Sequence, residues 1–352
     1  MLAAADLRER IRAALDTFLR ERAAELRQID IETDPIAGWL GTATGGGKLL
    51  RPSFCFWGFV GAGGDPSDER IVNAALVWEL LHASALVHDD LIDRSVVRRG
   101  HPTAHVRFAA LHVERRWTSD APEFGAAAAL LLGDLLLGWA DDALAESGFP
   151  AQHRQDARRL LATARAEMIV GQYLDVAHQA AASSSITDAL RVARLKSAKY
   201  TIERPLQLGA ALAGGPAELA LTFTAYGEPL GEAFQLCDDI AGVFGDPSLT
   251  GKPAGDDIRE GKRTALLALA YDRADTAGRQ VLDHAVGNPG ADDTALDRAR
   301  DVIRDSGARR SVADLVATRL SDALRAVERV SPPAREALVS LAHEVTDLSV
   351  VP

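Results

Sequence analysis

Two pairs of adjacent aspartates lie inside long apolar stretches of this chain. The pairs are Asp89-Asp90 and Asp238-Asp239, and the apolar stretches run from Ile71 to Val87 and from Phe223 to Phe244. An ionised carboxylate is costly to bury unless a partner compensates its charge, and two neighbouring carboxylates also repel each other. Hard metal cations and a polyanionic substrate would supply the compensating charge. We therefore interpret the two pairs as facing metal-binding rims over one deep apolar pocket.

Hydrophobic residues recur at a spacing of three to four through most of the chain, which indicates helices. The predicted helices span 4–28, 47–60, 69–94, 124–146, 152–180, 186–213, 216–244, 263–285, 295–305, 309–329 and 333–347. Glycine and proline separate them, and no strand-like hairpin is apparent. The long connections at 94–105, 111–123 and 245–263 are the loops in which functional residues are expected. The pattern predicts an all-α fold.

The composition is that of a globular protein with a large core. Apolar residues make up 47% of the 352 residues, charged residues make up 25%, and the formal net charge is −11. This negative charge argues against nucleic-acid binding and against affinity for anionic membranes. Cys55 and Cys237 lie far apart in apolar surroundings, which suggests buried thiols of a cytoplasmic protein without a disulfide framework.

No targeting segment and no convincing membrane span is evident. Charged residues are mixed into the N-terminal stretch from Met1 to Leu26, unlike the apolar core of a signal peptide. The stretch from Phe124 to Ala140 is apolar, but Asp134 interrupts it and it is short for a span. We interpret it as a buried core helix and expect no stable membrane insertion.

Asp89 and Asp93 are four residues apart, about one helical turn, and therefore project from the same face of a helix. Two carboxylates so placed can bridge a pair of Mg²⁺ ions and leave most coordination positions to water and phosphate oxygens. Arg98-Arg99 begin five residues later, and arginine suits bidentate recognition of phosphate. A solvated acidic helix end with ordinary salt bridges would also explain these residues, but their order favours a clamp for metal and diphosphate.

Two further segments carry basic residues. Lys48 and Arg51 lie three apart at a glycine-rich helix start, which can hold an anion through side chains and backbone N–H groups. Lys252 and the mixed charges of 256–263 follow the second aspartate pair. Solvated loop charge is the simpler interpretation of that segment taken alone.

Together these elements resemble the trans-isoprenyl diphosphate synthases, also called polyprenyl synthetases, from about Gly46 to Lys262. The motifs occur in the family's order: Gly-Gly-Lys-x-x-Arg-Pro at 46–52, Leu81-His82, His88-Asp89-Asp90-x-x-Asp93, Arg98-Arg99-Gly100-x-Pro102-Thr103, Gly171-Gln172-x-x-Asp175, Lys196-Ser197, Phe234-Gln235-x-x-Asp238-Asp239, Gly245-Asp246 and Gly251-Lys252. Any one of them could arise by chance, whereas the ordered set is highly specific.

The resemblance implies a single-domain helical bundle over 1–352, with about ten core helices around a deep central cavity, and usually a homodimer. It implies that isopentenyl diphosphate is condensed head to tail with an allylic diphosphate: dimethylallyl, geranyl or farnesyl. The allylic carbon–oxygen bond ionises, the isopentenyl double bond attacks the cation, and a proton is lost. Mg²⁺, about three ions per site, acts with Lys and Arg to stabilise the leaving group, while the apolar pocket excludes water.

The resemblance also assigns roles to individual residues. The metal ligands are Asp89 and Asp93, for a pair of ions, and Asp238, for a third. The allylic diphosphate site is Arg98, Lys196, Gln235 and Lys252, with Ser197 beside Lys196. The isopentenyl diphosphate site is Lys48, Arg51, His82 and Arg99. The catalytic set is Asp89, Asp93, Arg98, Lys196, Gln235, Asp238 and Lys252. Supporting candidates are Asp239, Gln172 and Asp175.

The sequence departs from the family pattern at two positions. Gly242 stands where many members carry the last aspartate of the second motif, and Ser197 stands in place of a threonine but keeps the hydroxyl. We expect Gly242 to weaken a water-mediated metal contact without abolishing activity. It leaves open a non-catalytic subunit.

Small side chains precede the first motif and bear on product length. Ala85 and Ser84, four and five residues before Asp89, would face the growing chain first, where members that stop at farnesyl often have an aromatic. Leu81 and Trp78 lie deeper, Trp78 roughly 16 Å up the axis, where it either forms the floor or packs against a neighbouring helix. The predicted product is geranylgeranyl diphosphate. Farnesyl diphosphate is the nearest alternative, and a longer chain is the next.

Three other classes of protein share parts of this pattern. A class I terpene cyclase shares the first motif, but its second metal motif differs, and it would not need Lys48 and Arg51. A di-iron four-helix protein would use Glu79-x-x-His82, but no convincing second copy occurs. A helical scaffold explains the helices but not the placement of the basic residues.

Overall fold

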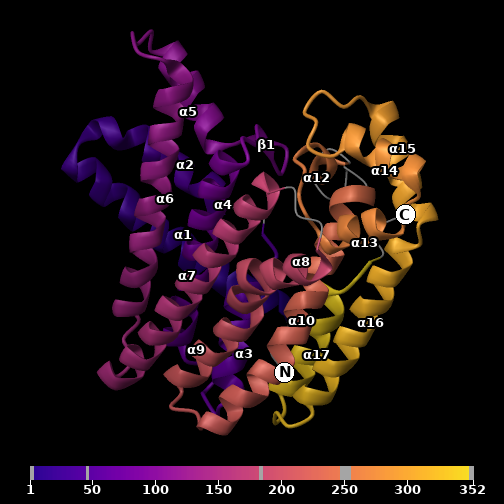
Figure 1. Cartoon of the computed structure of the whole chain (residues 1–352). Helices are drawn as coiled ribbons and strands as arrows, with labels where there is room; N and C mark the ends of the chain where they lie inside the picture. Colours follow the sequence, from indigo (N-terminus) through magenta and orange to yellow (C-terminus); the bar gives the residue numbers. More distant parts are fainter. Residues whose placement is uncertain (1–3, 45–46, 182–184, 246–254, 349–352) are drawn as a thin grey trace. The chain divides into compact units, whose positions relative to one another are not determined.

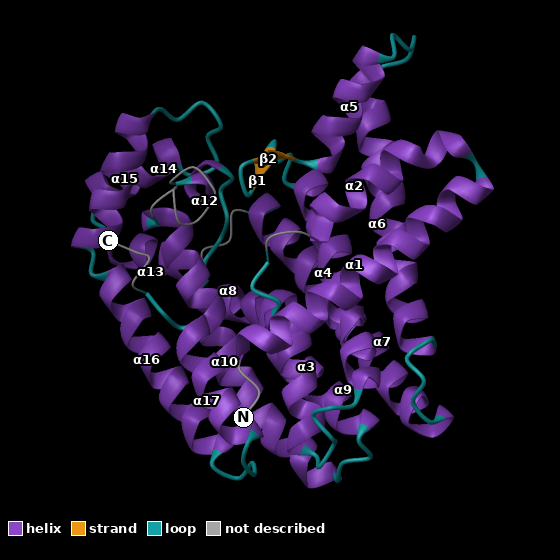
Figure 2. Cartoon of the chain, turned by 180° about the vertical axis from the view of Figure 1, so that it is seen from behind, coloured by secondary structure: helices purple, strands orange, loops and turns teal. Residues whose placement is uncertain are grey.

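Helices make up nearly all of the regular structure in the described part of the chain (Figure 1 and Figure 2). The computed structural model describes residues 4–44, 47–181, 185–245 and 255–348. Within these ranges the strands are limited to β1 (Val97–Arg98) and β2 (His101–Pro102), an antiparallel pair. The predicted all-α fold is confirmed. The hairpin escaped the sequence analysis because two-residue strands leave no alternating pattern.

The chain forms two compact units. One contains Met1–Arg159 and Leu208–Gly215, and the other contains Leu160–Gln207 and Pro216–Pro352. Two helices, α7 (Ala151–Ala180) and α9 (Arg204–Leu212), continue from one unit into the other. The single domain over 1–352 and its central cavity stay predictions.

The first unit contains two long apolar helices, α4 and α6. Its elements are α1 (Ala4–Ile29), the 3₁₀ turn η1 (Ile31–Thr33), α2 (Asp34–Thr44), α3 (Leu50–Gly61), α4 (Glu69–Ile92), β1, β2, α5 (Ala104–Glu114), α6 (Ala121–Ala145), the start of α7 and the end of α9. α4 begins where the Asp68 carboxylate accepts a hydrogen bond from Arg70 N–H. It is apolar on nearly all sides and packs against α3 and α6, so Trp78 and Leu80 are fully buried.

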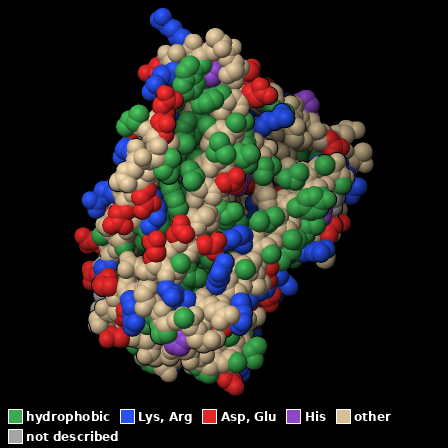
Figure 3. All heavy atoms as spheres, turned by 90° about the vertical axis from the view of Figure 1, so that its left-hand side faces the viewer, with side chains coloured by type: hydrophobic (Ala, Val, Ile, Leu, Met, Phe, Trp, Pro, Cys, Tyr) green, Lys and Arg blue, Asp and Glu red, His purple; other side chains and the backbone are tan. Residues whose placement is uncertain are grey.

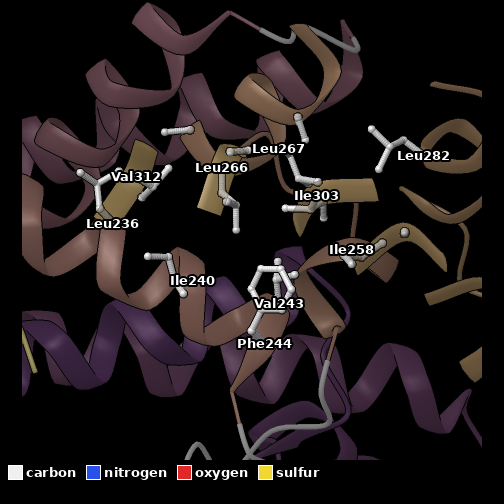
Figure 4. Packing of buried hydrophobic residues seen from close by; sticks show 14 of the residues in the cluster. Leu236, Ile240, Val243, Phe244, Ile258, Leu266, Leu267, Leu282, Ile303 and Val312 are labelled. Carbon is white, nitrogen blue, oxygen red and sulfur yellow. The ribbon is translucent and has the colours of Figure 1, made fainter. Parts of the chain in front are cut away.

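The second unit has its own hydrophobic core. Its elements are the rest of α7, α8 (Ile186–Ala193), the π-helix η2 (Arg194–Glu203), the start of α9, α10 (Ala217–Phe244), α12 (Asp256–Arg259), α13 (Ala265–Arg273), α14 (Thr276–Ala285), α15 (Asp293–Asp305), α16 (Ala308–Val327) and α17 (Ala334–Val345). Leu236, Ile240 and Val243 of α10 belong to this core (Figure 4). Ile258 of α12 and Leu266 of α13 are fully buried in the same core. Core packing therefore fixes the short α12 against the end of α10.

Several predicted helix boundaries were wrong. The predicted helix 263–285 is two helices, because the Asp275 side chain caps α14 by accepting a hydrogen bond from Gly278 N–H. Leu267 and Leu282 pack into one core on either side of this break, so the hydrophobic spacing continues across it. The short helices α2 and α5 were not predicted. The predicted helix 186–213 has nearly the right extent, but its middle is the π-helix η2.

Two helices, α4 and α6, are long and apolar enough to cross a membrane by length and composition alone, which is weak support for a span. In the apolar 18-residue segment of α4, 72% is buried, as in a core helix. In the corresponding segment of α6, only 39% is buried. The interpretation of 124–140 as a buried core helix therefore holds for one face of α6. Its other face leaves Leu130 and Leu131 exposed. Cys55 and Cys237 are buried free thiols, as predicted.

Candidate active site

The first aspartate motif lies at the C-terminal end of α4. Asp93 caps the helix, and its N–H donates to the Asp89 carbonyl oxygen at 2.8 Å, so the two residues are one turn apart. Arg94 adopts a left-handed conformation with a φ of 57°, and Ser95 N–H donates to the Asp90 carbonyl oxygen at 2.9 Å. This Schellman ending turns the chain away from the helix directly after the motif. Asp89 and Asp93 therefore lie together, partly buried, at one helix end.

A short hairpin returns Arg98 to the same helix end. Arg99 and Gly100 form its turn with φ angles of 52° and 76°, the positive values that a two-residue type I′ turn requires. Arg98 Nε and one terminal guanidinium nitrogen lie 2.7 and 2.6 Å from Asp90 Oδ1. The same terminal nitrogen lies 3.7 Å from Asp89 Oδ2. Arg98 thus lies beside the motif, with Asp90 as its direct partner.

Arg51 and Arg99 lie close together around a buried carboxylate of the first unit. This carboxylate is Glu79, which is only 5% exposed: burial raises its pKa, while Arg51 and Arg99 lower it. A Cβ added at Gly47 would lie 3.7 and 3.8 Å from the terminal nitrogens of Arg99 and 3.9 Å from Glu79 Oε2. Gly47 therefore borders the same cluster, and the exposed Lys48 follows it directly in the sequence.

His82 completes this basic cluster as a neutral side chain. Burial, followed by the charges of Arg51, Arg99 and Arg98, holds the pKa of its imidazole well below 6.5. Glu79 was not predicted as a member of this cluster, although the Glu79-x-x-His82 spacing places both side chains on one face of α4. Arginines outnumber carboxylates in the cluster, as an anion site requires.

The two aspartates of the second pair differ in environment. Asp238 is exposed on α10, whereas Asp239 is 5% exposed and accepts a hydrogen bond from Gln235 Nε2 at 2.9 Å. Burial raises the pKa of Asp239 to about 8; Asp257, Asp238 and Asp175 raise it as well, and Gln235 lowers it. Neighbouring residues on a helix point about 100° apart, so only Asp238 is open to solvent. Its role as a metal ligand stays a prediction.

Lys196 lies on the π-helix η2, with its Nζ 2.7 Å from Asp175 Oδ2. Two glycines allow the backbone of η2 to approach its neighbours. A Cβ at Gly171 of α7 would lie 2.4 Å from Lys196 N, and a Cβ at Gly231 of α10 would lie 2.4 Å from Ala198 Cβ. Both separations are too short for a side chain. π-Helical turns are frequent at functional sites, and this one joins two of the mid-chain motifs in space.

The remaining predicted diphosphate residues are less informative. Gln172 Nε2 is buried and has no hydrogen-bond partner among the described residues. Ser197 is partly buried next to Lys196. Lys252 lies outside the described residues, as do Gly46, Asp246 and Gly251 of the motifs.

The carboxylates suit a hard divalent cation by their chemistry. Mg²⁺ usually keeps several waters and takes one or two carboxylates together with substrate phosphates. Asp89 with Asp93, and Asp238 by itself, fit this requirement. In the ranges that the structure describes, no group of three or more His, Cys, Asp or Glu side chains is arranged to hold a metal ion.

The predicted chain-length residues lie along α4. Trp78, Leu81 and Ser84 are buried, and Ala85 is partly buried. The Trp78 indole lies near the Cys55 thiol of α3: burial raises the pKa of that thiol to about 12, and the indole lowers it. Trp78 therefore faces α3, and its role as a floor stays a prediction.

Comparison with known proteins gives the family directly. A model of the polyprenyl synthetase family matches residues 39–303. The (2E,6E)-farnesyl diphosphate synthase of Mycobacterium tuberculosis is 33% identical over 306 residues, which are 86% of this chain and 79% of that protein. The geranylfarnesyl diphosphate synthase of Aeropyrum pernix is 34% identical over 299 residues, 83% of this chain and 87% of that protein.

A solved structure is also similar along the whole chain. The geranylgeranyl pyrophosphate synthase of Corynebacterium glutamicum, complexed with isoprenyl diphosphate and magnesium, is 37% identical with a TM-score of 0.94. The match covers 99% of this chain and 100% of that chain. The chain therefore belongs to the polyprenyl synthetase family, as the ordered motifs predicted, and is a prenyltransferase that elongates prenyl diphosphates.

Proposed function

We propose that this protein condenses isopentenyl diphosphate head to tail with allylic diphosphates, in a Mg²⁺-dependent reaction whose main product is geranylgeranyl diphosphate. The observation that supports the proposal is that the first unit holds two different groups of charged side chains, one at the C-terminal end of α4 and one around Glu79. Asp89 and Asp93 with Arg98 suit a diphosphate that binds together with metal. The cluster of Arg51, Arg99 and His82 suits a diphosphate bound by the protein alone.

Each predicted residue has a task in this reaction. Asp89 and Asp93 would hold a pair of Mg²⁺ ions and Asp238 a third, about three in all. Bound Mg²⁺ supplies positive charge to the leaving diphosphate. The allylic diphosphate would be bound by Arg98, Lys196, Gln235 and Lys252, with Ser197 adjacent. Isopentenyl diphosphate would be bound by Lys48, Arg51, His82 and Arg99.

The reaction needs no nucleophile from the protein. The allylic carbon–oxygen bond breaks and both electrons leave with the diphosphate oxygen. The isopentenyl double bond attacks the allylic cation, forms the new carbon–carbon bond, and the adduct loses a proton to the released diphosphate. His82 is neutral at pH 7, so it can donate a hydrogen bond to the isopentenyl diphosphate without changing its own charge during the reaction.

The product assignment depends on the α4 residues before Asp89. Ser84 and Ala85 are small, so a growing chain can pass them, and the wall begins with Leu81 and Trp78. Among the similar proteins, one makes farnesyl and another geranylfarnesyl diphosphate by name. We place this protein between them, at geranylgeranyl diphosphate.

We also propose that the protein is a cytoplasmic homodimer that uses the apolar face of α6. Leu130 and Leu131 on this face are 49% and 58% exposed. Hydrophobic side chains gather in a strip on the face of the molecule in Figure 3. Large exposed apolar patches are uncommon on monomers and mark interaction sites. Sedimentation velocity should give a dimer, and Leu131→Glu should give monomers.

Metal dependence of binding tests the proposed division between the two anion sites. In calorimetric titrations, isopentenyl diphosphate should bind with EDTA present, because its site has no metal ligand. A non-ionising thiolo analogue of geranyl diphosphate should bind only with Mg²⁺. Equal dependence of both ligands on Mg²⁺ would contradict the proposal.

A further inference from the structure

Three basic residues, which we call the basic row, follow one another at intervals of five along the π-helix η2 and into α9. They are Arg194, Lys199 and Arg204. The hydrogen bonds of a π-helix join residues that are five apart, whereas five residues of an α-helix turn through about 140° beyond a full turn. The spacing of the basic row therefore matches the wide turn of a π-helix and not the turn of an α-helix.

Two carboxylates bridge neighbouring members of the basic row. Glu228 Oε1 of α10 lies 3.6 Å from a terminal nitrogen of Arg194 and 3.9 Å from Lys199 Nζ. Glu167 Oε1 of α7 lies 3.5 Å from Lys199 Nζ and 2.6 Å from a terminal nitrogen of Arg204. Each carboxylate contacts two basic residues that are five apart, so the three side chains lie on one side of the helix.

Further contacts anchor the basic row at both ends. Arg194 donates to Glu232 Oε1 of α10 at 2.7 Å, and Arg319 Nε of α16, which packs beside α10 (Figure 1), lies 2.8 Å from the other oxygen of Glu232. Arg204 donates from two nitrogens to the two oxygens of Glu167 at 2.8 and 2.6 Å. Alternating charges therefore tie η2 to α7, α10 and α16.

The middle of the basic row is mostly buried and stays charged. The side chains of Lys199 and Arg204 are 15% and 14% exposed, and that of Glu167 is 19% exposed. Burial raises the pKa of Glu167, but Arg204 and Lys199 together lower it below its ordinary value. A buried charge is costly when it loses its partner, so each member of the network holds the others in place.

Lys196, the predicted ligand of the allylic diphosphate, lies within the span of the basic row. It follows Arg194 by two residues, and its Nζ lies 2.7 Å from Asp175 Oδ2. A return of one π turn to α-helical pitch shifts the residues beyond it by one position, which is roughly 100° of rotation. The direction of the Lys196 side chain relative to the rest of the helix therefore depends on the π turn.

We propose that the basic row holds η2 in its π-helical form and so positions Lys196 for the allylic diphosphate. This inference rests on the proposed function. Members of the basic row are positioning residues, because they act through the helix and not on the substrate. The glycines of α7 and α10 that face η2 allow its close approach, and the basic row supplies the attraction that keeps it there.

Ligand binding tests the proposal without turnover. Calorimetry measures the affinity for the thiolo analogue of geranyl diphosphate with Mg²⁺, and for isopentenyl diphosphate with EDTA. Arg204→Met and Arg194→Gln should each weaken binding of the analogue by about 10-fold, because a displaced Lys196 no longer meets the diphosphate. Binding of isopentenyl diphosphate should stay within about twofold of the wild type, because the residues proposed to bind it belong to the first unit.

The environment of Lys196 can also be followed directly in the ligand-free protein. Isotopic labelling of lysine at Cε gives a simple NMR spectrum, because the lysines of the chain are only Lys48, Lys196, Lys199, Lys252 and Lys262. The signal that Lys196→Arg removes belongs to Lys196. Arg204→Met and Arg194→Gln should shift this signal, because they disturb the ion pair of Lys196 with Asp175.

Arg22→Met is the matched control. Arg22 of α1 contacts both carboxylate oxygens of Glu146, at 3.0 and 2.8 Å, and its side chain is 13% exposed. The substitution therefore removes an ion pair of similar geometry and burial to that of Arg204 with Glu167. It should lower the melting temperature, as Arg204→Met does, but leave the analogue affinity and the Lys196 signal unchanged.

Failure of the inference can be told apart from failure of the proposed function. If Arg204→Met and Arg194→Gln both bind the analogue as the wild type does, or both leave the Lys196 signal unmoved, the inference is overturned. An equal loss of affinity in Arg22→Met overturns it too, because general destabilisation would then explain the effect. If the wild type does not bind the analogue with Mg²⁺, the proposed function fails, and the Lys196 signal still tests the basic row. The Arg194 side chain is 45% exposed, so its variant gives a result even if Arg204→Met does not fold.

Discussion

Arg98 binds Asp90, the middle aspartate of the first motif, through two nitrogens at 2.7 and 2.6 Å from one carboxylate oxygen. Asp90 points into the protein, with a side chain 7% exposed, whereas the Asp89 side chain is 17% exposed. The three acids of the motif therefore divide their tasks. Asp90 orients Arg98, and Asp89 and Asp93 are the candidates for the metal.

Loss of the Asp90–Arg98 ion pair should reduce stability. Asp90→Asn leaves the mostly buried Arg98 guanidinium with Asp89 at 3.7 Å in place of its 2.6 Å carboxylate partner, at a cost of about 1–3 kcal/mol in the free energy of unfolding. Urea unfolding of the metal-free protein measures this. Asp134→Asn is the control, because Asp134 is 61% exposed, and it should change little. Equal effects of the two substitutions would show that Asp90 has no special structural role.

The metal ligands should behave in the opposite way. Asp89→Asn and Asp93→Asn should lower kcat by about 10²-fold or more, because the leaving diphosphate loses charge stabilisation. The melting temperature of the metal-free protein should stay the same or rise, because like charges at one helix end are removed. Steady-state kinetics measures the first effect and calorimetry the second. Near-normal turnover of either variant would contradict the assignment of Asp89 and Asp93 as ligands of the metal that binds the diphosphate.

Substitutions in the two diphosphate sites should separate kinetically. Arg51→Ala and Lys48→Ala should mainly raise KM for isopentenyl diphosphate, and Lys196→Ala and Lys252→Ala should mainly raise KM for the allylic substrate. Arg98 and Arg99 adjoin in the sequence, yet Arg98 contacts Asp90 and Arg99 lies near Glu79. They should therefore divide between the two substrates. Indistinguishable effects across all six would refute the division.

His82 makes stability depend on pH in a defined direction. Burial and the nearby arginines hold its pKa well below 6.5 in the folded protein, whereas the unfolded chain titrates near 6.5. Below that pH the unfolded chain binds a proton that the folded protein does not, so the free energy of unfolding falls on acidification, by up to about 1.4 kcal/mol per pH unit. His82→Gln should flatten this slope in urea titrations between about pH 6.5 and 5. Parallel slopes for the two proteins would count against a neutral His82.

Product length tests the residues along α4. Ser84→Phe should shorten the product, because an aromatic would block the chain one turn from the metals. Trp78→Ala should lengthen it only if Trp78 forms the floor, whereas its interaction with Cys55 of α3 makes a purely structural role the other outcome. Chromatography of dephosphorylated products decides. If Ser84→Phe leaves the product unchanged, the growing chain does not run along α4 past residue 84. If Trp78→Ala leaves the product length unchanged, only the role of Trp78 as the end of the pocket is rejected.

Much of the fold was predictable, because helices leave a local record in the sequence. The periodicity placed α4 and α10, and the spacing of Asp89 and Asp93 predicted their common face. The partners of these residues were not predictable, because contacts between distant segments leave no spacing signal. Glu79 lies among arginines at 51 and 99, and Asp257 reaches Gly242 only through the fold. The π-helix also depends on glycines of two other helices.

Incorporation of labelled isopentenyl diphosphate tests the central claim most directly. The purified protein is incubated with dimethylallyl, geranyl or farnesyl diphosphate, with Mg²⁺ or with EDTA, and the dephosphorylated products are separated by chromatography. The account predicts Mg²⁺-dependent incorporation into linear chains that end mainly at geranylgeranyl. No incorporation with any primer, or a cyclic hydrocarbon formed without isopentenyl diphosphate, would contradict it.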